Sequence, residues 1–473
     1  MLVLKDKKDL DNKYNPVVRT SIPGPESLKL LMSQRRFESS AVTYPNNIQI
    51  AIKQAIGTYV IDMDDNTYID FLSGAGVLSL GHNHEKLKEV AKSQLDTLSH
   101  GLDFNTPIKD EFIKAQISML PTNMQENMKI HFCGPTGADA VETAIKMAKK
   151  HTKRGSIVSF QGGYHGCTNG AMSLTGLVSP KEDVQNNMAG VHFFPFAYCL
   201  RCPLGLDKNS CDTNCANYFT NSLDDPNGGV EKPAAIILEI VQGEGGSIVA
   251  PKEFIQKIRK YTKDNDILMI VDEVQTGCGR TGTWFAFEQY DIEPDIIVVS
   301  KGVSGIGFPM SFIMYNTSIR NWSKGSHIGT FRGNQLAFAT GAEAVNIFRS
   351  EKILENVNIQ SAIIFNKLKS ELKNCSIIGE IRGIGLMIGI EVIDSNTLKR
   401  SQALARAIQK ECLINGLIIE TGGRNDSVLR LLPPLNINAT DVSLAINILC
   451  ESINQIALNE KQTKDSAEMY YEI

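Results

Sequence analysis

The stretches ILMIVDEV (residues 267–274) and DIIVVSKG (residues 295–302) decide the fold, because each is a short, continuous apolar run that ends in polar residues. Two similar runs lie upstream, GSIVSF at 155–160 and AAIILEIV at 234–241, and helical patterns separate the runs. Continuous apolar strands that alternate with helices are typical of a parallel sheet covered on both faces. The sequence therefore predicts an α/β domain with a mostly parallel sheet.

The segments on either side of this domain have different patterns. YVIDMDDNTYIDFLSG at 59–74 alternates apolar and polar residues around an Asp-Asp-Asn turn, which predicts a hairpin. Near the other end, helical stretches flank IIGEIRGIGLMIGIEV at 377–392, which indicates a smaller α+β domain. We predict an N-terminal arm and small lobe over 1–74, a large ligand-binding domain over 75–345 and a C-terminal small domain over 346–473.

The composition excludes several classes of protein. Of 473 residues, 48 are basic and 52 acidic with both signs scattered, so the chain lacks the basic stripe of a nucleic-acid binder. No apolar run approaches the roughly 18 residues of a membrane span, and the N-terminus has no signal-peptide pattern. The ten cysteines do not have the spacing of a secreted disulfide framework. We expect a cytoplasmic protein whose partners are small molecules and copies of itself.

Asp272 and Lys301 follow two of the predicted strands, at the edge where open α/β sheets bind ligands. A lysine after a buried strand loses hydration, which lowers its pKa and favours the neutral amine that attacks an aldehyde. A carboxylate at the neighbouring strand end can hold a pyridine nitrogen protonated, and this pairing makes pyridoxal 5'-phosphate an electron sink. Taken singly, each residue has a simpler interpretation, a turn cap for Asp272 and a solvated lysine for Lys301.

A phosphate site is predicted in HFCGPTGADAVETAIKMAKK, residues 131–150, where a Gly-Pro-Thr-Gly turn opens a helix with an apolar stripe. The free amides of Gly137 and Ala138, with the Thr136 hydroxyl, would face an anion at the positive end of the helix dipole. In GGYHG, residues 162–166, Tyr164 could stack on a flat ring. A Gly-rich turn before a helix is often only structural, and a lone aromatic is usually a core residue.

These motifs together resemble one family. FCGPTGADAVETAIKMAK, SFQGGYHG, ILEIVQGEGG, IVDEVQTGCGRTG, PDIIVVSKG, HIGTFRGNQLA and VLRLLPPLNI look like the successive motifs of class III (ω-amino-acid) aminotransferases, over roughly residues 45–455. LSGAGVLSLGHNH, GPTGADAVE and TFRGNQLA are most similar to the group that acts on 2,4-diaminobutyrate and 2-oxoglutarate. The resemblance implies fold type I of the pyridoxal-phosphate-dependent transferases, with a large domain and a smaller α+β domain.

The resemblance also implies roles for individual residues around the cofactor. Lys301 would hold the cofactor as a Schiff base and shuttle protons, Asp272 would face the pyridine nitrogen, and Gln275 would hydrogen-bond the ring hydroxyl. Glu239 is expected near the cofactor ring. Gly137 and Ala138 would bind the phosphate and Tyr164 would stack on the ring. Thr330 would bind the phosphate of the neighbouring subunit's cofactor, which implies a homodimer with shared active sites.

The family resemblance further implies a substrate gate made by Glu244 and Arg430. In this gate the arginine pairs with the glutamate when an amine donor is bound, and it swings free to hold the α-carboxylate of glutamate or 2-oxoglutarate. A buried guanidinium needs a carboxylate from the protein or from the substrate, which fits that behaviour. The alternative interpretation is a permanent salt bridge.

Two positions depart from the pattern of ornithine-type members of the family. Those members hold the donor's α-carboxylate with a tyrosine and an arginine where this chain has Ala75 and Cys167, which argues against ornithine as donor. The replacement for that clamp is not evident. Arg332, beside Thr330, is interpreted as an interface residue, with a substrate clamp as the alternative.

Four cysteines, Cys199, Cys202, Cys211 and Cys215, have C-x2-C-x8-C-x3-C spacing, which is compatible with zinc or an iron-sulfur cluster. They lie outside the family's catalytic motifs, so we predict reduced loop cysteines and no metal, and keep a structural metal as the alternative. The histidines, including His165, are interpreted as hydrogen-bonding residues.

The function that the sequence favours is a two-stage transamination. The terminal amine of a diamino or ω-amino acid, with 2,4-diaminobutyrate as first choice, would pass to the cofactor and then to 2-oxoglutarate. A racemase, epimerase or aminomutase on the same fold is the alternative, since proton removal is common to all of them. The Glu244 and Arg430 pair favours transamination, and a non-catalytic protein is disfavoured because every residue that the chemistry needs is present.

Overall fold

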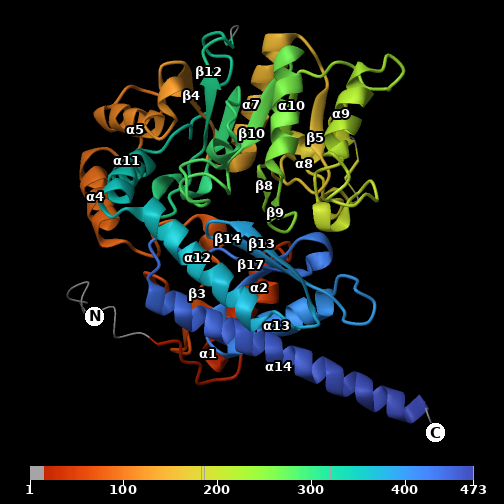
Figure 1. The fold of residues 1–473 in the computed structure, drawn as a ribbon. Helices are drawn as coiled ribbons and strands as arrows, with labels where there is room; N and C mark the ends of the chain where they lie inside the picture. The colour runs from red at the N-terminus through yellow and green to blue at the C-terminus, as the bar shows by residue number, and fades with distance from the viewer. Residues whose placement is uncertain (1–14, 183, 186, 320–321, 472–473) are drawn as a thin grey trace.

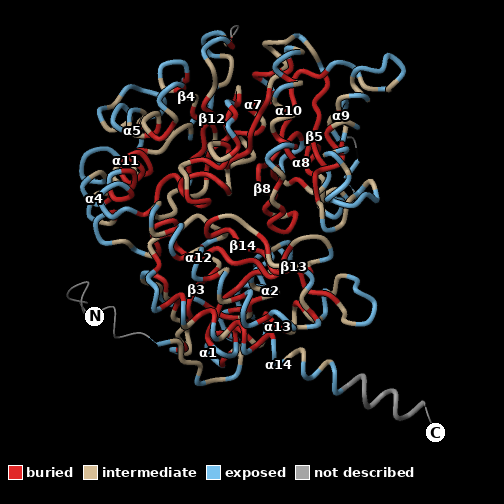
Figure 2. Tube along the Cα trace, viewed as in Figure 1, coloured by how far each residue is buried: buried red, intermediate tan, exposed pale blue. Residues whose placement is uncertain are grey.

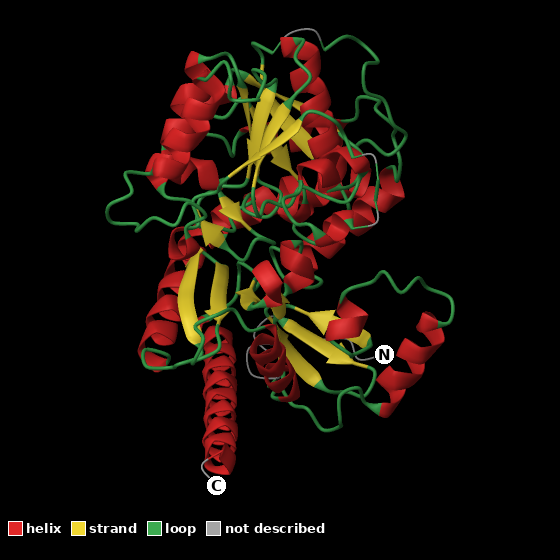
Figure 3. Ribbon diagram, turned by 90° about the vertical axis from the view of Figure 1, so that its right-hand side faces the viewer, coloured by secondary structure: helices red, strands yellow, loops and turns green. Residues whose placement is uncertain are grey.

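The computed structural model describes residues 15–182, 184–185, 187–319 and 322–471, and it has two main parts (Figure 1). One part contains a seven-stranded sheet with its helices, and the other contains two smaller sheets and the long C-terminal helix (Figure 3). Buried residues concentrate inside each part and along the region where the two meet (Figure 2). No helix among the described residues is long and apolar enough to cross a membrane.

The large sheet has the order β4-β12-β11-β10-β7-β5-β6. Strands β11, β10, β7, β5 and β6 run parallel, and β12 is antiparallel to both of its neighbours. The prediction of a mostly parallel sheet is therefore confirmed. The strands are β4 (Met128–Phe132), β5 (Ile157–Phe160), β6 (Val191–Phe194), β7 (Ala235–Leu238), β10 (Leu268–Asp272), β11 (Ile296–Val299) and β12 (Phe312–Asn316).

The apolar runs of the sequence are continuous because both faces of this sheet are covered. In β10, Met269 and Val271 belong to the hydrophobic core on one face, and Ile270 belongs to the core on the other. The main helices of this part are α4 (Glu85–Thr97), α5 (Pro107–Ile117), α7 (Gly137–Thr152), α8 (Asn169–Leu174), α9 (Asn214–Asp224), α10 (Lys252–Asp264) and α11 (Gln335–Ser350).

The second part contains two four-stranded sheets. The first has the order β1-β2-β3-β15 and the second β13-β14-β17-β16. Their strands are β1 (Ile52–Ile56), β2 (Tyr59–Asp62), β3 (Thr67–Asp70), β13 (Ile378–Ile384), β14 (Met387–Val392), β15 (Leu417–Ile418), β16 (Glu420–Gly422) and β17 (Val428–Leu431). The main helices here are α1 (Pro25–Arg35), α12 (Ile353–Glu371), α13 (Gln402–Ile414) and α14 (Ala439–Tyr471), of which α14 projects from the body (Figure 3).

The predicted hairpin over residues 59–74 is present as the antiparallel pair β2 and β3. Its sheet is completed by β15, which pairs in parallel with β3 and comes from the C-terminal third of the chain. The N-terminal lobe and the C-terminal domain thus share one sheet, and the three-part division at 74 and 345 stays a proposal. Of the predicted N-terminal arm, residues 1–14 lie outside the described residues, and Val17 forms a bridge with Thr67.

Candidate active site

Residues at the ends of five strands of the large sheet, the neighbours β11, β10, β7 and β5 together with β4, surround one cavity of about 450 Å³. Because parallel strands end at the same edge, the chain's order of strands brings together side chains that are far apart in sequence. The residues used below are Thr136, Gly137, Tyr164, Glu239, Asp272 and Lys301, with Glu244 at the wall. The structure therefore places all of these predicted residues around one cavity.

Lys301 follows β11, and its backbone has a φ of 43°, in the left-handed region that residues other than glycine rarely adopt. No hydrogen bond or ion pair with another described residue involves its amine. Burial lowers the pKa of the Lys301 amine, while the charges of Glu244 and Arg430 act in opposite directions and leave the pKa lowered. A larger neutral fraction makes this amine a better nucleophile.

Asp272, at the end of β10, is held by two donors. The Val274 backbone N–H donates to Asp272 Oδ1 at 3.0 Å, and His165 Nδ1 lies 2.8 Å from Asp272 Oδ2. Both side chains are buried, so the carboxylate has a fixed orientation. The sequence identified His165 only as a hydrogen-bonding residue. Its partner could not be foreseen, because 107 residues separate it from Asp272.

Glu239 follows β7 and accepts two backbone hydrogen bonds. The Tyr164 N–H donates to Oε1 at 2.9 Å and the Gly243 N–H donates to Oε2 at 2.8 Å. Burial raises the pKa of Glu239 to about 7, with the charge of His165 opposing this rise and that of Asp272 adding to it. Glu239 therefore fixes the turn that carries Tyr164. The Tyr164 hydroxyl lies 3.1 Å from Cys167 Sγ.

The predicted phosphate site is the start of α7. Thr136 caps this helix, and its hydroxyl donates to Asp139 Oδ2 at 2.7 Å while accepting from the Asp139 N–H at 3.3 Å. The first amides of the helix, at Gly137 and Ala138, have no acceptor within the helix. Gly166 packs closely on them, since a Cβ at Gly166 would lie 2.5 Å from Ala138 Cβ. An anion bound here would therefore meet two backbone amides, with the Thr136 hydroxyl occupied by the cap.

Arg430 is buried beside the same cavity and contacts three side chains. It donates to Glu244 at 2.8 Å, to Glu420 at 2.9 Å and to the Gln275 side-chain oxygen at 2.7 Å. Burial acts to lower the pKa of Arg430, but the two carboxylates outweigh it and leave the pKa raised. The expected pair of Glu244 and Arg430 is thus present, and Glu420 is an additional partner that sequence reasoning missed.

The contacts of Gln275 and Glu420 add detail to the expected gate. Gln275, which was expected at the cofactor's ring hydroxyl, accepts a hydrogen bond from Arg430 through its side-chain oxygen in this structure. The Tyr44 hydroxyl donates to Glu420 at 3.0 Å, so a residue from the N-terminal lobe reaches the gate. Strand β16 is only three residues long, which explains why the pairing of Glu420 with Arg430 had no recognisable signal.

Three other residues singled out in the sequence lie away from this cavity's wall. Thr330 is exposed and does not line the cavity of its own chain. The Arg332 guanidinium donates to backbone carbonyls of Phe132, at 3.0 Å, and of His327. Ala75 lies in a short turn with a φ of 57°.

The four cysteines of residues 199–215 are free thiols that line one small cavity. Within the described ranges, no group of three or more histidine, cysteine or acidic side chains is arranged to hold a metal ion. Burial raises the pKa of the Cys215 thiol to about 11. Reduced loop cysteines stay the prediction for this cluster, with a structural metal as the alternative.

The cavity fits pyridoxal 5'-phosphate in four respects. It offers an amine with no hydrogen-bond partner in the described part of the chain, a buried carboxylate, an aromatic ring and the amino end of a helix. These groups match the aldehyde, the pyridine nitrogen, the flat ring and the phosphate of that molecule. The four matching groups come from segments that follow or end different strands, so the match does not depend on one local motif.

Comparisons with known proteins identify the family of this chain. Residues 40–453 match the family model described as aminotransferase class-III. A diaminobutyrate–2-oxoglutarate aminotransferase of Rhizobium meliloti is 44% identical over 434 residues, which cover 89% of this chain and 92% of the relative. A protein of the same name from Haemophilus influenzae is 43% identical, with 88% and 93% covered.

The fold also matches solved structures. An amine transaminase from an uncultivated Pseudomonas species, solved in its PLP-bound form, has a TM-score of 0.80 at 25% identity, with 89% of this chain and 98% of that one covered. This likeness confirms the predicted architecture, a large domain with a mostly parallel sheet and a smaller domain.

Proposed function

The chain belongs to the class III aminotransferases, and from this premise we propose that it exchanges the terminal amino group of L-2,4-diaminobutyrate with 2-oxoglutarate in two half-reactions. The observation that carries the proposal is the position of Arg430, buried between Glu244 and Glu420 beside the cavity that contains Lys301. Relatives that are 44% and 43% identical have this activity in their names, which supports the choice of donor.

Class III aminotransferases use pyridoxal 5'-phosphate, as the PLP-bound transaminase of similar fold illustrates. When bound, this group supplies an electron sink for the substrate carbon that carries the amine. In this chain Lys301 would hold its aldehyde carbon, Asp272 its ring nitrogen and Tyr164 the face of its ring. The amides of Gly137 and Ala138 would hold its phosphate at the positive end of α7.

Lys301 and Asp272 have distinct tasks. The Lys301 amine, with its pKa lowered by burial, would take and return the proton at the substrate carbon that bears the amino group. Asp272 would face the ring nitrogen, held in place by His165 and by the Val274 amide. The buried surroundings exclude water, which strengthens both electrostatic interactions.

Arg430 would let one site accept two differently shaped substrates. Glu244 pairs with Arg430 and is 30% exposed, whereas Arg430 is 1% exposed, so the glutamate is the partner that has room to move. When Glu244 turns away, Arg430 can bind the α-carboxylate of glutamate or 2-oxoglutarate. Glu420 and Gln275 keep Arg430 in place during that exchange.

A racemase, epimerase or aminomutase remains the second candidate, because Lys301 would move a proton in those reactions as well. The products of such enzymes keep an amino group on the carbon skeleton of the substrate, so these enzymes have no need of 2-oxoglutarate. The paired carboxylates around Arg430 favour the transaminase, since a buried arginine with a movable partner serves an exchange of substrates.

The test is to record the visible absorbance of the purified holoenzyme while 2,4-diaminobutyrate and then 2-oxoglutarate are added. We expect the band of the lysine-bound cofactor to disappear with the diamine and to return with the oxo acid. Lys301→Ala should show neither change. Lys53→Ala, which removes an exposed lysine paired with Asp65, is the matched control and should cycle as wild type does.

Three outcomes separate the candidates. A band that cycles as described supports the transaminase with this donor. A band that persists with every amine donor, in an enzyme that exchanges the substrate's α-proton with solvent, favours the racemase. A purified protein that never shows the band after incubation with pyridoxal 5'-phosphate would contradict the cofactor assignment.

We also propose that the protein is a homodimer, since Thr330 is exposed on its own chain and is expected to complete the partner's phosphate site. The cytoplasmic location stays a prediction, which rests on the sequence patterns described above.

A further inference from the structure

A second cavity adjoins the catalytic one and is rich in arginine. It has a volume of about 660 Å³, and Glu244 lines both cavities. Its wall includes Arg201, Arg400 and Arg424, together with Gln161 and Tyr198. We call this cavity the arginine pocket. No step proposed above uses these residues.

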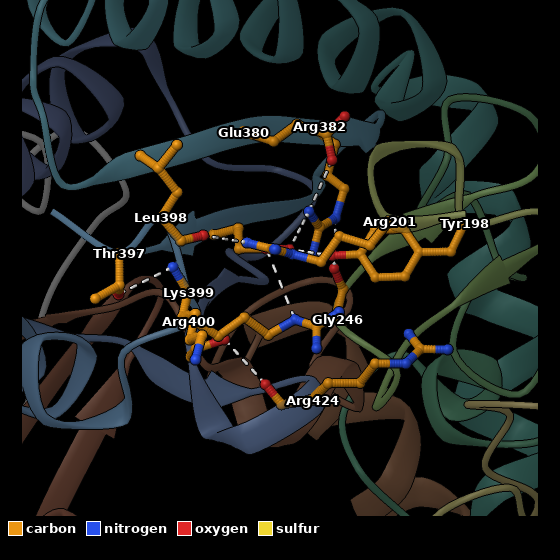
Figure 4. A network of polar contacts seen from close by, with 12 residues as sticks. Tyr198, Arg201, Gly246, Glu380, Arg382, Thr397, Leu398, Lys399, Arg400 and Arg424 are labelled. Carbon is orange, nitrogen blue, oxygen red and sulfur yellow. Dashed lines mark hydrogen bonds and ion pairs between the residues drawn. The ribbon is translucent and has the colours of Figure 1, made fainter. Parts of the chain in front are cut away.

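The arginines gather around the ring of Tyr198 (Figure 4). Three guanidinium carbons lie over this ring, those of Arg424 at 4.8 Å, Arg382 at 5.3 Å and Arg400 at 5.6 Å from its centre. Positive charges grouped around one ring repel one another, so this arrangement needs anions to stabilise it.

The protein supplies fewer anions than cations here. Glu391 is fully buried and accepts from Arg201 at 2.7 Å and from Arg382 at 2.9 Å. Arg400 Nε lies 3.7 Å from the same carboxylate, beyond hydrogen-bond distance. Glu380 accepts from Arg382 at 2.8 Å. Four guanidinium groups therefore share two carboxylates.

Arg424 has no carboxylate partner among the described residues. Its guanidinium donates only to the carbonyls of Gly245 and Gln161, both at 3.3 Å. Burial lowers the pKa of Arg424. The charges of Tyr198 and Glu391 act to raise this pKa, and the positive charges of Arg400 and Arg382 act to lower it. Because its described partners are neutral carbonyls, the positive charge of Arg424 is available to a ligand.

The other acidic residues of the pocket wall already have cationic partners. Asp426 accepts from Arg406 at 3.1 Å, and Glu244 accepts from Arg430 at 2.8 Å. Neither neutralises Arg424. The pocket keeps an excess of positive charge, and it lies next to the gate because the Gly423 N–H donates to the Glu244 carbonyl at 3.1 Å.

We propose that the arginine pocket, through Arg424, binds the substrate carboxylate that lies farthest from the reacting carbon. This inference rests on the proposed function, in which both substrates have such a group. In diaminobutyrate it is the α-carboxylate, because the terminal amine reacts. In 2-oxoglutarate it is the γ-carboxylate, while Arg430 takes the carboxylate next to the oxo group. One fixed anion site then serves both half-reactions.

The first experiment compares two acceptors in Arg424→Gln holoenzyme. Pyruvate has the oxo acid group of 2-oxoglutarate but lacks the far carboxylate. We expect kcat/KM for 2-oxoglutarate to fall roughly 10- to 100-fold, as loss of a charged hydrogen bond implies, and kcat/KM for pyruvate to stay unchanged. Arg424→Lys should recover part of the loss because it keeps the charge.

Arg349→Gln is the matched control, since Arg349 lies on α11, contacts Ser118 and lines neither cavity. It should leave both acceptors unaffected. Equal losses with 2-oxoglutarate and pyruvate in Arg424→Gln would assign Arg424 a structural role and overturn the proposal, as would no loss with either acceptor.

The second experiment measures binding without turnover, by calorimetry of the holoenzyme with glutarate. We expect Arg424→Gln to weaken glutarate binding by roughly tenfold or more and 2-oxoglutarate to compete with it. Weakened binding in a protein that does not turn over 2-oxoglutarate would support the pocket and contradict the proposed function. Unchanged binding, or glutarate that binds together with 2-oxoglutarate, would overturn the pocket's role.

Discussion

At the scale of single residues, Glu273 shows how burial next to the active site makes stability depend on pH. It follows Asp272 directly, is buried, and accepts from the Phe287 N–H at 2.9 Å and from the Thr276 hydroxyl. Burial raises the pKa of Glu273 from 4.5 to about 7, against the opposing effect of those hydrogen bonds. Between these two pH values the folded chain keeps a proton that the unfolded chain has released.

Glu273 therefore lowers the free energy of unfolding as the pH rises from about 4.5 to about 7, and the loss is complete above that range. This decrease in the free energy of unfolding is about 3 kcal/mol, at roughly 1.4 kcal/mol for each pKa unit. Glu273→Gln, whose oxygen can accept from the Phe287 N–H while its amide nitrogen donates to the Thr276 hydroxyl, should become more stable relative to wild type by that amount between pH 5 and pH 8. Denaturant unfolding at several pH values measures this difference.

Glu126→Gln, which changes an exposed glutamate, is the control for the Glu273 experiment. The stability difference between this variant and wild type should stay constant with pH. A constant difference for Glu273→Gln as well would show that Glu273 stays ionised in the folded protein.

His165 is a positioning residue whose effect passes through Asp272. Without the His165 ring, Asp272 Oδ2 loses its only side-chain donor among the described residues, and the carboxylate can turn. We expect His165→Ala to lower kcat by about tenfold, the value of a buried hydrogen bond to a charged group. His165→Asn, which keeps a donor, should recover part of this loss. Weaker retention of pyridoxal 5'-phosphate on dialysis is the second readout, and full activity of His165→Ala would contradict the role.

At the scale of elements, the site depends on how the turn after β5 packs on the start of α7. Gly166 has a φ of 130° and lies so close to Ala138 that a Cβ would meet Ala138 Cβ at 2.5 Å. Gly166→Ala must therefore displace the first turn of α7, where the phosphate amides lie. We expect at least a tenfold loss of affinity for pyridoxal 5'-phosphate, measured by equilibrium titration of the apoenzyme, since a charged hydrogen bond contributes that much.

Gly155→Ala is a matched control for this substitution, because a Cβ at Gly155 would meet nothing within 4 Å. It should bind the cofactor as wild type does. If Gly166→Ala also binds as wild type does, α7 can shift without loss of the phosphate site, and the proposed role of its first amides is wrong.

The elements also show what the sequence could and could not predict. The sheet, Asp272 and Lys301 were predictable because continuous apolar runs end sharply at polar residues. Glu420 was not, because it faces Arg430 through the pairing of β16 with β17, and β16 spans only three residues. Strand β15, of two residues, carries no periodicity either, so its parallel pairing with β3 could not be foreseen. Short strands of this kind are defined by their tertiary neighbours.

At the scale of the whole molecule, the proposed dimer makes the two active sites depend on each other. Lys301 lines the cavity of its own chain, whereas Thr330 is exposed and lies outside that cavity. If Thr330 contacts the phosphate in the partner's site, Lys301→Ala and Thr330→Asp damage different halves of a shared site. The aspartate would place a negative charge against the phosphate, so each variant alone should have little activity.

Mixing the two variants under conditions that exchange subunits distinguishes a shared site from a separate one. A mixed dimer contains one site with both substitutions and one site with neither, provided that Thr330 acts across the interface. With random pairing, roughly a quarter of all sites should then regain wild-type activity, because half of the dimers are mixed and each has one intact site. If Thr330 acted within its own chain, every site would have one substitution and mixing would restore nothing. Steady-state activity, measured against the mixing ratio, distinguishes the two cases. In the control, Lys53→Ala replaces Thr330→Asp in the mixture. Activity should then rise only in proportion to the share of Lys53→Ala subunits.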